Sequence, residues 1–107
     1  MKDLIEALKL LWPCLKDPNT KWPTSCEHEI LYICGVDMNK VTVDDVHLLA
    51  IYGFIPGSDE DYRYTSIYNE NDEYEGDIDF EHIDEETWNN IKYEITNCFR
   101  SYRFGSC

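Results

Sequence analysis

The sequence predicts an α+β fold, with a small antiparallel sheet and two to three helices in one domain spanning residues 1–107. Some stretches carry apolar residues at the three- and four-residue spacing of amphipathic helices, and others alternate apolar with polar residues as half-buried strands do. The 107 residues match the length of a single domain, and no segment repeats. A chain this short, with 43% hydrophobic residues, buries a small core that a cross-link would help to stabilise.

The N-terminal half is predicted to contain a helix, a loop and a strand. A helix is expected over residues 2–12 and ends at Pro13. Its apolar stripe consists of Leu4, Ile5, Leu8, Leu11 and Trp12. Residues 13–27 hold three of the four prolines and predict an ordered loop, and 29–34 is an apolar, β-branched and aromatic run typical of a strand.

A second helix is predicted from a capping signal. Thr42 and Asp45 have the spacing of a capping box, and Gly53 stands where a helix-ending glycine belongs. The residues expected to face inward are Val43, Val46, Leu49 and Ala50.

Beyond residue 57 the sequence predicts a hairpin, a helix and a last strand. A strand is expected in which tyrosine or serine side chains at positions 62, 64, 66 and 68 point to the same face. The tip of the hairpin is expected near 69–76. Asp84 is predicted to cap a helix that continues to about Asn97. The ending CFRSYRFGSC alternates again over 98–104, with Cys107 just past this strand.

The net charge of −13 is concentrated in one segment. Residues 59–86 hold 13 acidic residues and one basic residue, Arg63, whereas the other 79 residues are nearly balanced. Solvated faces are the usual explanation for such runs, but tyrosines are interleaved with the acid here. Because tyrosine provides contact area at low entropic cost, the segment is predicted to bind a basic protein surface that normally handles nucleic acid. Direct binding of nucleic acid by this surface is disfavoured by the same charge.

The residues predicted to carry that contact lie in the first two thirds of the acidic segment. The acidic members are Asp59, Glu60, Asp61, Glu70, Asp72, Glu73, Glu75 and Asp77, and the tyrosine anchors are Tyr62, Tyr64 and Tyr74.

Cysteine usage indicates a metal site. The first residues lack the features of a secretory signal and no apolar run is long enough to span a membrane, so a cytoplasmic location is expected. Thiols stay reduced there, and five cysteines cannot all pair within one chain. One structural Zn²⁺ per chain is therefore predicted, bound by Cys26, His28, Cys107 and Cys14, which would fasten the C-terminus to the early loop. His47, Cys34 and Cys98 remain alternatives for the fourth ligand.

Two other metal hypotheses are weaker. A catalytic zinc would use Glu27 or Glu29 as general base, but cysteine-rich shells usually mark closed structural sites, so a non-enzymatic protein is expected. The stretch 71–82 imitates a calcium-binding loop, with Gly76 at the turn position, yet His82 replaces the bidentate glutamate.

Several motifs resemble a family of small phage-encoded proteins. These are the segment Cys26-Glu-His28-Glu-Ile-Leu-Tyr-Ile, the predicted helix ending in Gly53-Phe54, and Ser101–Cys107 with its terminal Phe-Gly-Ser-Cys. The chain is similar to zinc-binding anti-CRISPR proteins that block type II-A Cas9, with residues 57–97 as an elaboration. The resemblance implies a Cas9–guide RNA complex as partner and a host-cell cytoplasmic location. The alternatives are a zinc-stabilised adaptor or regulator of another phage or host protein, and a small zinc enzyme.

Overall fold

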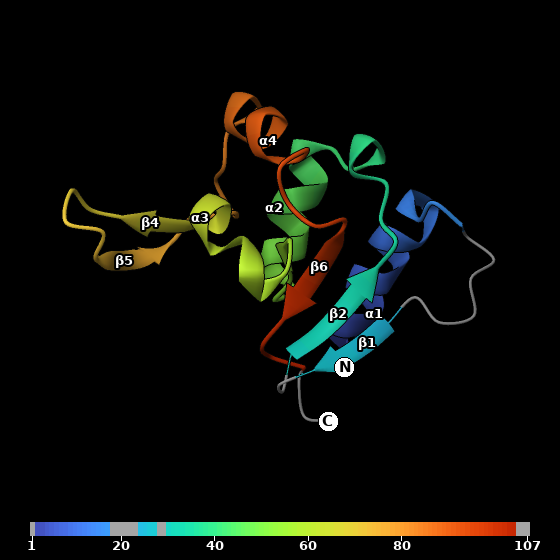
Figure 1. Cartoon of the computed structure of the whole chain (residues 1–107). Helices are drawn as coiled ribbons and strands as arrows, with labels where there is room; N and C mark the ends of the chain where they lie inside the picture. Colours follow the sequence, from blue (N-terminus) through green and yellow to red (C-terminus); the bar gives the residue numbers. More distant parts are fainter. Residues whose placement is uncertain (1, 18–23, 28–29, 105–107) are drawn as a thin grey trace.

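The structure, a computed structural model, describes residues 2–17, 24–27 and 30–104 (Figure 1). The helices are α1 (Lys2–Leu11), α2 (Val43–Ile51), α3 (Tyr62–Thr65) and α4 (Glu85–Ile91), and the 3-10 turns are η1 (Trp12–Cys14), η2 (Met38–Lys40) and η3 (Asp59–Asp61). The strands are β1 (Thr24–Glu27), β2 (Ile30–Cys34), β3 (Ile55–Pro56), β4 (Ser66–Tyr68), β5 (Tyr74–Asp77) and β6 (Cys98–Ser101). These elements confirm the α+β class.

The main sheet has four antiparallel strands in the order β1-β2-β6-β3, and β4 and β5 form a separate hairpin. Helices α1 and α2 lie on one side of the main sheet (Figure 1). Ala7 and Leu11 from α1 and Leu49 from α2 pack there with Ile33 and Phe99 of the sheet. The opposite face of the sheet carries a smaller cluster, which consists of Ile30, Tyr32 and Cys98 with Cys34 against it.

Local chemistry explains why α2 forms where the sequence predicts it. The Thr42 hydroxyl accepts a hydrogen bond from the Asp45 N–H at 3.2 Å, and Asp45 Oδ2 accepts one from the Thr42 N–H at 3.1 Å. This capping box supplies partners for N–H groups that the first helical turn leaves unpaired. Gly53 follows the helix with φ of 94°, a conformation that favours glycine. The predicted cap of α4 is confirmed too, because Asp84 accepts from the Thr87 N–H at 3.1 Å.

Four expectations about the elements are wrong. The predicted loop 13–27 ends in β1, which pairs with β2 as an edge strand. Positions 62 and 64 are predicted to lie in a strand, but residues 62–65 form the helical turn α3. Helix α4 ends at Ile91 rather than near Asn97, and the last strand ends at Ser101 rather than at 104.

The stripe predicted for the first helix is shifted around its axis. Ala7 and Leu11 are buried, whereas Ile5 and Trp12 are each about half exposed. Leu4 and Leu8 pack against the core as predicted. Pro13 lies within η1 and ends the helix, so Trp12 belongs to that turn and not to α1.

Within the ranges described, no helix combines the length and the apolar character needed to cross a membrane.

Candidate functional site

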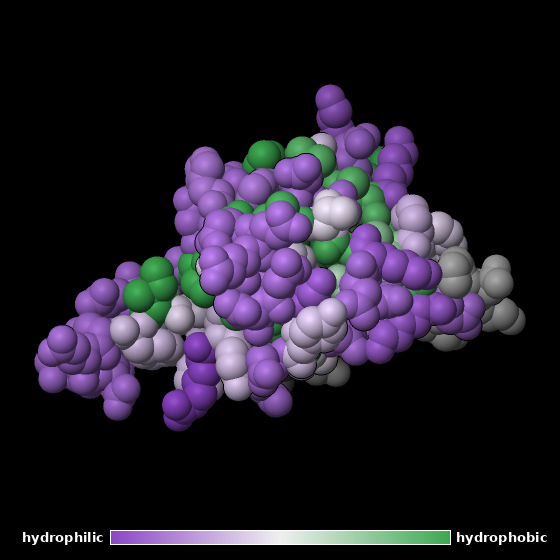
Figure 2. Space-filling view, turned by 90° about the horizontal axis from the view of Figure 1, so that it is seen from above, coloured by the Kyte–Doolittle hydropathy of each residue, from purple (hydrophilic) through white to green (hydrophobic). Residues whose placement is uncertain are grey.

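The most distinctive surface is an acidic arm, defined here as residues 59–77, which comprises η3, α3, β4 and β5. The hairpin of the arm projects away from the main sheet (Figure 1), and hydrophilic side chains cover its far end (Figure 2). The arm contains eight acidic residues and one basic residue. Eight of the 13 acidic residues of segment 59–86 therefore lie in the arm, and those of its hairpin are presented on a protrusion.

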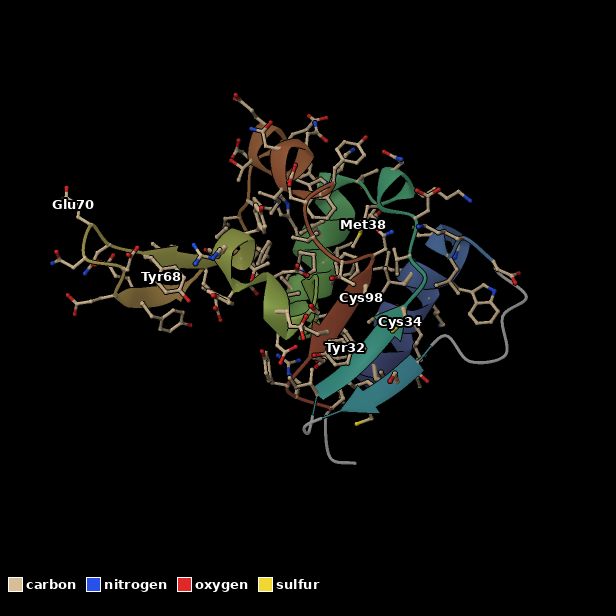
Figure 3. All side chains as sticks on the ribbon, in the orientation of Figure 1. Tyr32, Cys34, Met38, Tyr68, Glu70 and Cys98 are labelled. Atoms are coloured by element: carbon tan, nitrogen blue, oxygen red, sulfur yellow. The ribbon has the colours of Figure 1, made fainter. Side chains whose placement is uncertain are left out.

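Asn69 organises the tip of the arm. Its side-chain oxygen accepts hydrogen bonds from the N–H groups of Asn71 at 2.8 Å and Glu73 at 3.0 Å. Its backbone N–H donates to the Glu73 carbonyl, and its carbonyl accepts from the Asp72 N–H. Asp72 adopts a left-handed φ of 59°, which aspartate tolerates better than most residues. The acidic tip, with Glu70 at its end (Figure 3), thus has a defined backbone.

Three tyrosines form a ladder along the arm. The rings of Tyr62 and Tyr68 lie 6.0 Å apart between centroids, those of Tyr68 and Tyr74 lie 5.9 Å apart, and both pairs meet edge to face. All three side chains are exposed. Edge-to-face contacts stabilise such rings, so the ladder offers a preformed aromatic surface beside the carboxylates.

A groove lies beside this ladder. It has a volume of about 410 Å³ and is lined by Tyr62, Arg63, Tyr68 and Asp72. The Arg63 guanidinium carbon lies 5.7 Å from the centre of the Tyr62 ring, so one ring already contacts a cation. A ring face next to a carboxylate suits a lysine or arginine side chain of a partner, because both the ring quadrupole and the negative charge attract it.

Hydrogen bonds fix the base of the arm to the body. Asp61 Oδ2 accepts from the N–H groups of Ser58 at 2.8 Å and Thr96 at 2.9 Å. Burial raises the pKa of Asp61, but these backbone hydrogen bonds outweigh burial and lower that pKa overall. The hydroxyl of Tyr32, on β2, donates to Asp59 Oδ1 at 2.9 Å. Burial, together with this hydrogen bond, raises the pKa of Tyr32 to about 12.

Arg100 contacts the base of the arm from β6 and is not among the residues predicted from sequence. Its side chain is buried in β6, where Nη1 donates to the Pro56 carbonyl at 2.8 Å and Nη2 to Thr65 Oγ1 at 3.2 Å. Thr65 is itself fully buried and ends α3. The available sequence signal was an arginine directly after the apolar pair Cys98-Phe99 in a predicted strand, since a buried arginine needs several acceptors.

The predicted contact residues divide into two groups. Asp59 and Asp61 bond the body, and Asp77 accepts hydrogen bonds from Ser66 and Tyr74 within the hairpin. Only Asp61 is partly buried: Asp59 and Asp77 are exposed despite these bonds, and so are the other predicted residues, Glu60, Glu70, Asp72, Glu73, Glu75, Tyr62, Tyr64 and Tyr74. Tyr68, which completes the ladder, was missed as an anchor because nothing in its sequence position distinguishes it from its neighbours.

The predicted zinc ligands are described only in part, because His28 and Cys107 lie outside the described residues. Cys14 is buried in the main core, and its Sγ lies 3.6 Å from the Leu10 carbonyl and 3.4 Å from the Lys40 carbonyl. Burial raises the pKa of this thiol, with the negative charge of Asp45 adding to the effect. Cys26 lies on the edge strand β1 and is part of a disulfide.

The alternative ligands have other roles in this structure. His47 Nε2 lies 2.6 Å from the Ile83 carbonyl oxygen, and Cys34 faces Cys98 across β2 and β6. Among residues 2–17, 24–27 and 30–104, no three His, Cys, Asp or Glu side chains are grouped to hold a metal ion. The zinc site, which also needs His28 and Cys107, stays a prediction.

Comparison with protein-family models, with curated proteins and with solved structures found no match to this chain. The function is therefore inferred from the charge, the geometry and the sequence motifs of the chain itself.

Proposed function

We propose that this chain is a non-enzymatic binding protein whose acidic arm occupies a basic, nucleic-acid-handling surface of a protein partner. The observation that carries the proposal is the coincidence of three features on one protrusion: clustered carboxylates, an exposed tyrosine ladder and a tip ordered by Asn69. A basic groove attracts such a surface at long range, and the aromatic rings add contact area after docking.

The partner we propose is the Cas9–guide RNA complex of a type II-A system, as the sequence resemblance implies. The channel of such a complex is positively charged because it holds nucleic acid backbone. An arm that fills part of this channel would compete with target DNA, so the proposed outcome is inhibition of DNA loading. The protein would then act as a partial mimic of DNA charge.

Charge reversal at the tip tests the proposal. In the quadruple variant, Glu70, Asp72, Glu73 and Glu75 are each replaced by lysine, and binding to an immobilised Cas9–guide complex is measured by surface plasmon resonance. The expected result is a loss of affinity of about a hundredfold or more, with binding by the unaltered chain weakening as NaCl is raised. DNA cleavage by the complex should recover in parallel.

A matched control variant makes the same change in net charge at positions outside the arm. Its four substitutions to lysine are at Glu81, Glu85, Glu86 and Glu94, all of them exposed. This variant should retain most of the affinity, because its altered charges lie outside the docking surface. Equal losses in the two variants would contradict a local contact by the arm.

The experiment tests the identity of the partner and the role of the arm separately. If the unaltered chain does not bind Cas9–guide complex but binds another basic protein in a salt-sensitive, tip-dependent manner, the Cas9 assignment is wrong and the adaptor class is supported. If binding to Cas9–guide complex persists in the quadruple variant, the arm is not the contact surface.

A further inference from the structure

The outer face of the main sheet carries two thiols side by side. Cys34 in β2 and Cys98 in β6 are direct partners in the antiparallel register, and both lie outside any disulfide. Direct partners in a sheet project from the same face, so the two sulfur atoms leave the backbone in the same direction. Cys34 and Cys98, both labelled in Figure 3, occupy the neighbouring strands β2 and β6.

The backbone hydrogen bonds show which type of pair this is. The Cys98 carbonyl accepts from the Gly57 N–H at 2.7 Å, at the strand edge that faces β3. Because the N–H and C=O of a strand residue point to the same edge, Cys98 forms no ladder bond with Cys34. Cys34 and Cys98 are therefore a non-hydrogen-bonded pair. The Cα atoms of such pairs are about 4.5 Å apart, within the range of roughly 4.4–6.8 Å found for disulfides.

A cavity of about 580 Å³ opens onto the pair. Cys34 and Cys98 line it together with Tyr32, Asp59 and Thr96. The volume suits a small molecule, and the mixture of hydroxyl and carboxylate groups suits a polar one. Cys34 is partly exposed in this cavity, whereas Cys98 is only 3% exposed and burial raises its pKa to about 12. The accessible thiol is therefore Cys34.

We propose that Cys34 and Cys98 form a thiol–disulfide exchange site for low-molecular-weight disulfides that enter this cavity. In the first step, the Cys34 thiolate attacks one sulfur of the disulfide, its S–S bond breaks, and the departing thiolate takes up a proton. In the second step, Cys98 attacks the Cys34 sulfur and displaces the second small thiol. The protein dithiol loses two electrons and two protons, and the small disulfide is reduced to two thiols.

Other uses of the pair are less consistent with the geometry. A zinc or iron site needs more ligands, and the part of the chain that the structure describes offers no third metal-binding side chain beside the pair. Cys14 provides an internal comparison, because its buried thiol points at two backbone carbonyls and, among the described residues, is not paired with a second cysteine across strands. This inference is independent of the binding role of the acidic arm.

The test uses the full chain and glutathione disulfide as the probe. Samples are quenched with acid at intervals, remaining thiols are alkylated, and peptides are mapped by mass spectrometry. Cleavage after Glu29 separates Cys26 from Cys34, and cleavage after Arg100 separates Cys98 from Cys107, so that the existing disulfide does not confuse the assignment. The expected result is a glutathione adduct on Cys34 that converts to a Cys34–Cys98 disulfide, at least about tenfold faster than any modification of Cys14.

Two variants separate the steps. Cys98→Ser should accumulate the glutathione adduct on Cys34, because the second attack is removed, whereas Cys34→Ser should leave Cys98 unmodified. Circular dichroism checks that each variant is folded. If a variant does not fold, the time course of the unaltered chain tests the proposal by showing whether the adduct on Cys34 converts to the Cys34–Cys98 disulfide. Persistence of both residues as thiols, or an adduct on Cys34 that never converts, would overturn the proposal.

Discussion

Carboxylates in this chain serve two purposes, and the difference is visible residue by residue. Asp61 turns one oxygen toward two backbone N–H groups of different segments and so fixes the turn before the arm to the loop before β6. Glu60, next to it, is exposed to solvent. The sequence pattern predicts both in the same contact surface, because spacing and charge do not reveal which acid is surrounded by backbone donors.

Replacement of Asp61 by asparagine should lower stability in a pH-dependent way. The hydrogen bonds stabilise the ionised carboxylate, so the variant should lose about 1–2 kcal/mol of unfolding free energy at pH 7. The folded-state pKa lies below the ordinary 3.8, and this stabilisation should therefore be lost as pH falls through that lowered value. Urea unfolding of both proteins at pH 7 and near pH 3 measures the change.

Glu60→Gln is the control for Asp61, since it removes one negative charge from the neighbouring residue without removing bonds to the body. Its unfolding free energy should stay within about 0.5 kcal/mol of the unaltered chain. A difference between Asp61→Asn and the unaltered chain that stays constant down to pH 3 would show that ionisation of Asp61 is not the cause.

At the scale of elements, the long periodic segments were predictable and the short ones were not. The capping box at Thr42 and Asp45 is a local signal, and α2 begins where it predicts. The turn α3 and the two-residue strand β3 depend instead on tertiary partners, among them the Arg100 guanidinium that bonds Pro56 and Thr65. A short segment has too few residues for periodicity to distinguish a helical turn from a strand.

The candidate site was predictable to a similar extent. Composition alone located the acidic segment, and the tyrosines within it indicated a contact surface. The disulfide at Cys26 and the pairing of Cys34 with Cys98 were not predictable, because register between distant strands decides which sulfur atoms meet.

Replacement of Arg100 by lysine should loosen the arm. One ammonium group cannot reproduce the two divergent guanidinium bonds to Pro56 and Thr65, so we expect a loss of about 1–3 kcal/mol of unfolding free energy. Hydrogen exchange of backbone amides in α3 and β4 should accelerate, because Thr65 loses its partner in β6. Mass spectrometry of deuterium uptake reports both regions.

Arg103→Lys is the matched control for this element. Arg103 is exposed and pairs with Asp3 at 2.9 Å, so its replacement should change stability by less than about 0.5 kcal/mol. Equal deuterium uptake in the arm of the Arg100 and Arg103 variants would show that the arm is held by other contacts.

At the scale of the whole molecule, a net charge of −13 is large for a domain of 107 residues and lowers its stability. The core is built from α1, α2, the main sheet and buried side chains of the C-terminal half such as Phe80, Ile83 and Trp88, and most of the negative charge lies in residues 59–86. Mutual repulsion among these carboxylates opposes a compact state. A cross-link in the body therefore has a physical purpose, and Cys26 is the described residue through which both candidate cross-links, disulfide and zinc, would pass.

Zinc and a disulfide are mutually exclusive at Cys26, since a metal ligand must be a thiolate. If zinc is the native cross-link, protein purified under reducing conditions without chelators should contain about one zinc per chain by elemental analysis. Cys26→Ser and Cys107→Ser should each lower both the metal content and the melting temperature, the latter by roughly 10 °C, because the cross-link contributes to folding. Cys34→Ser should leave the metal content unchanged if Cys14 is the fourth ligand. The cross-link would instead be the disulfide if metal-free protein melts at the same temperature as protein supplied with zinc and Cys26 resists alkylation until the protein is reduced.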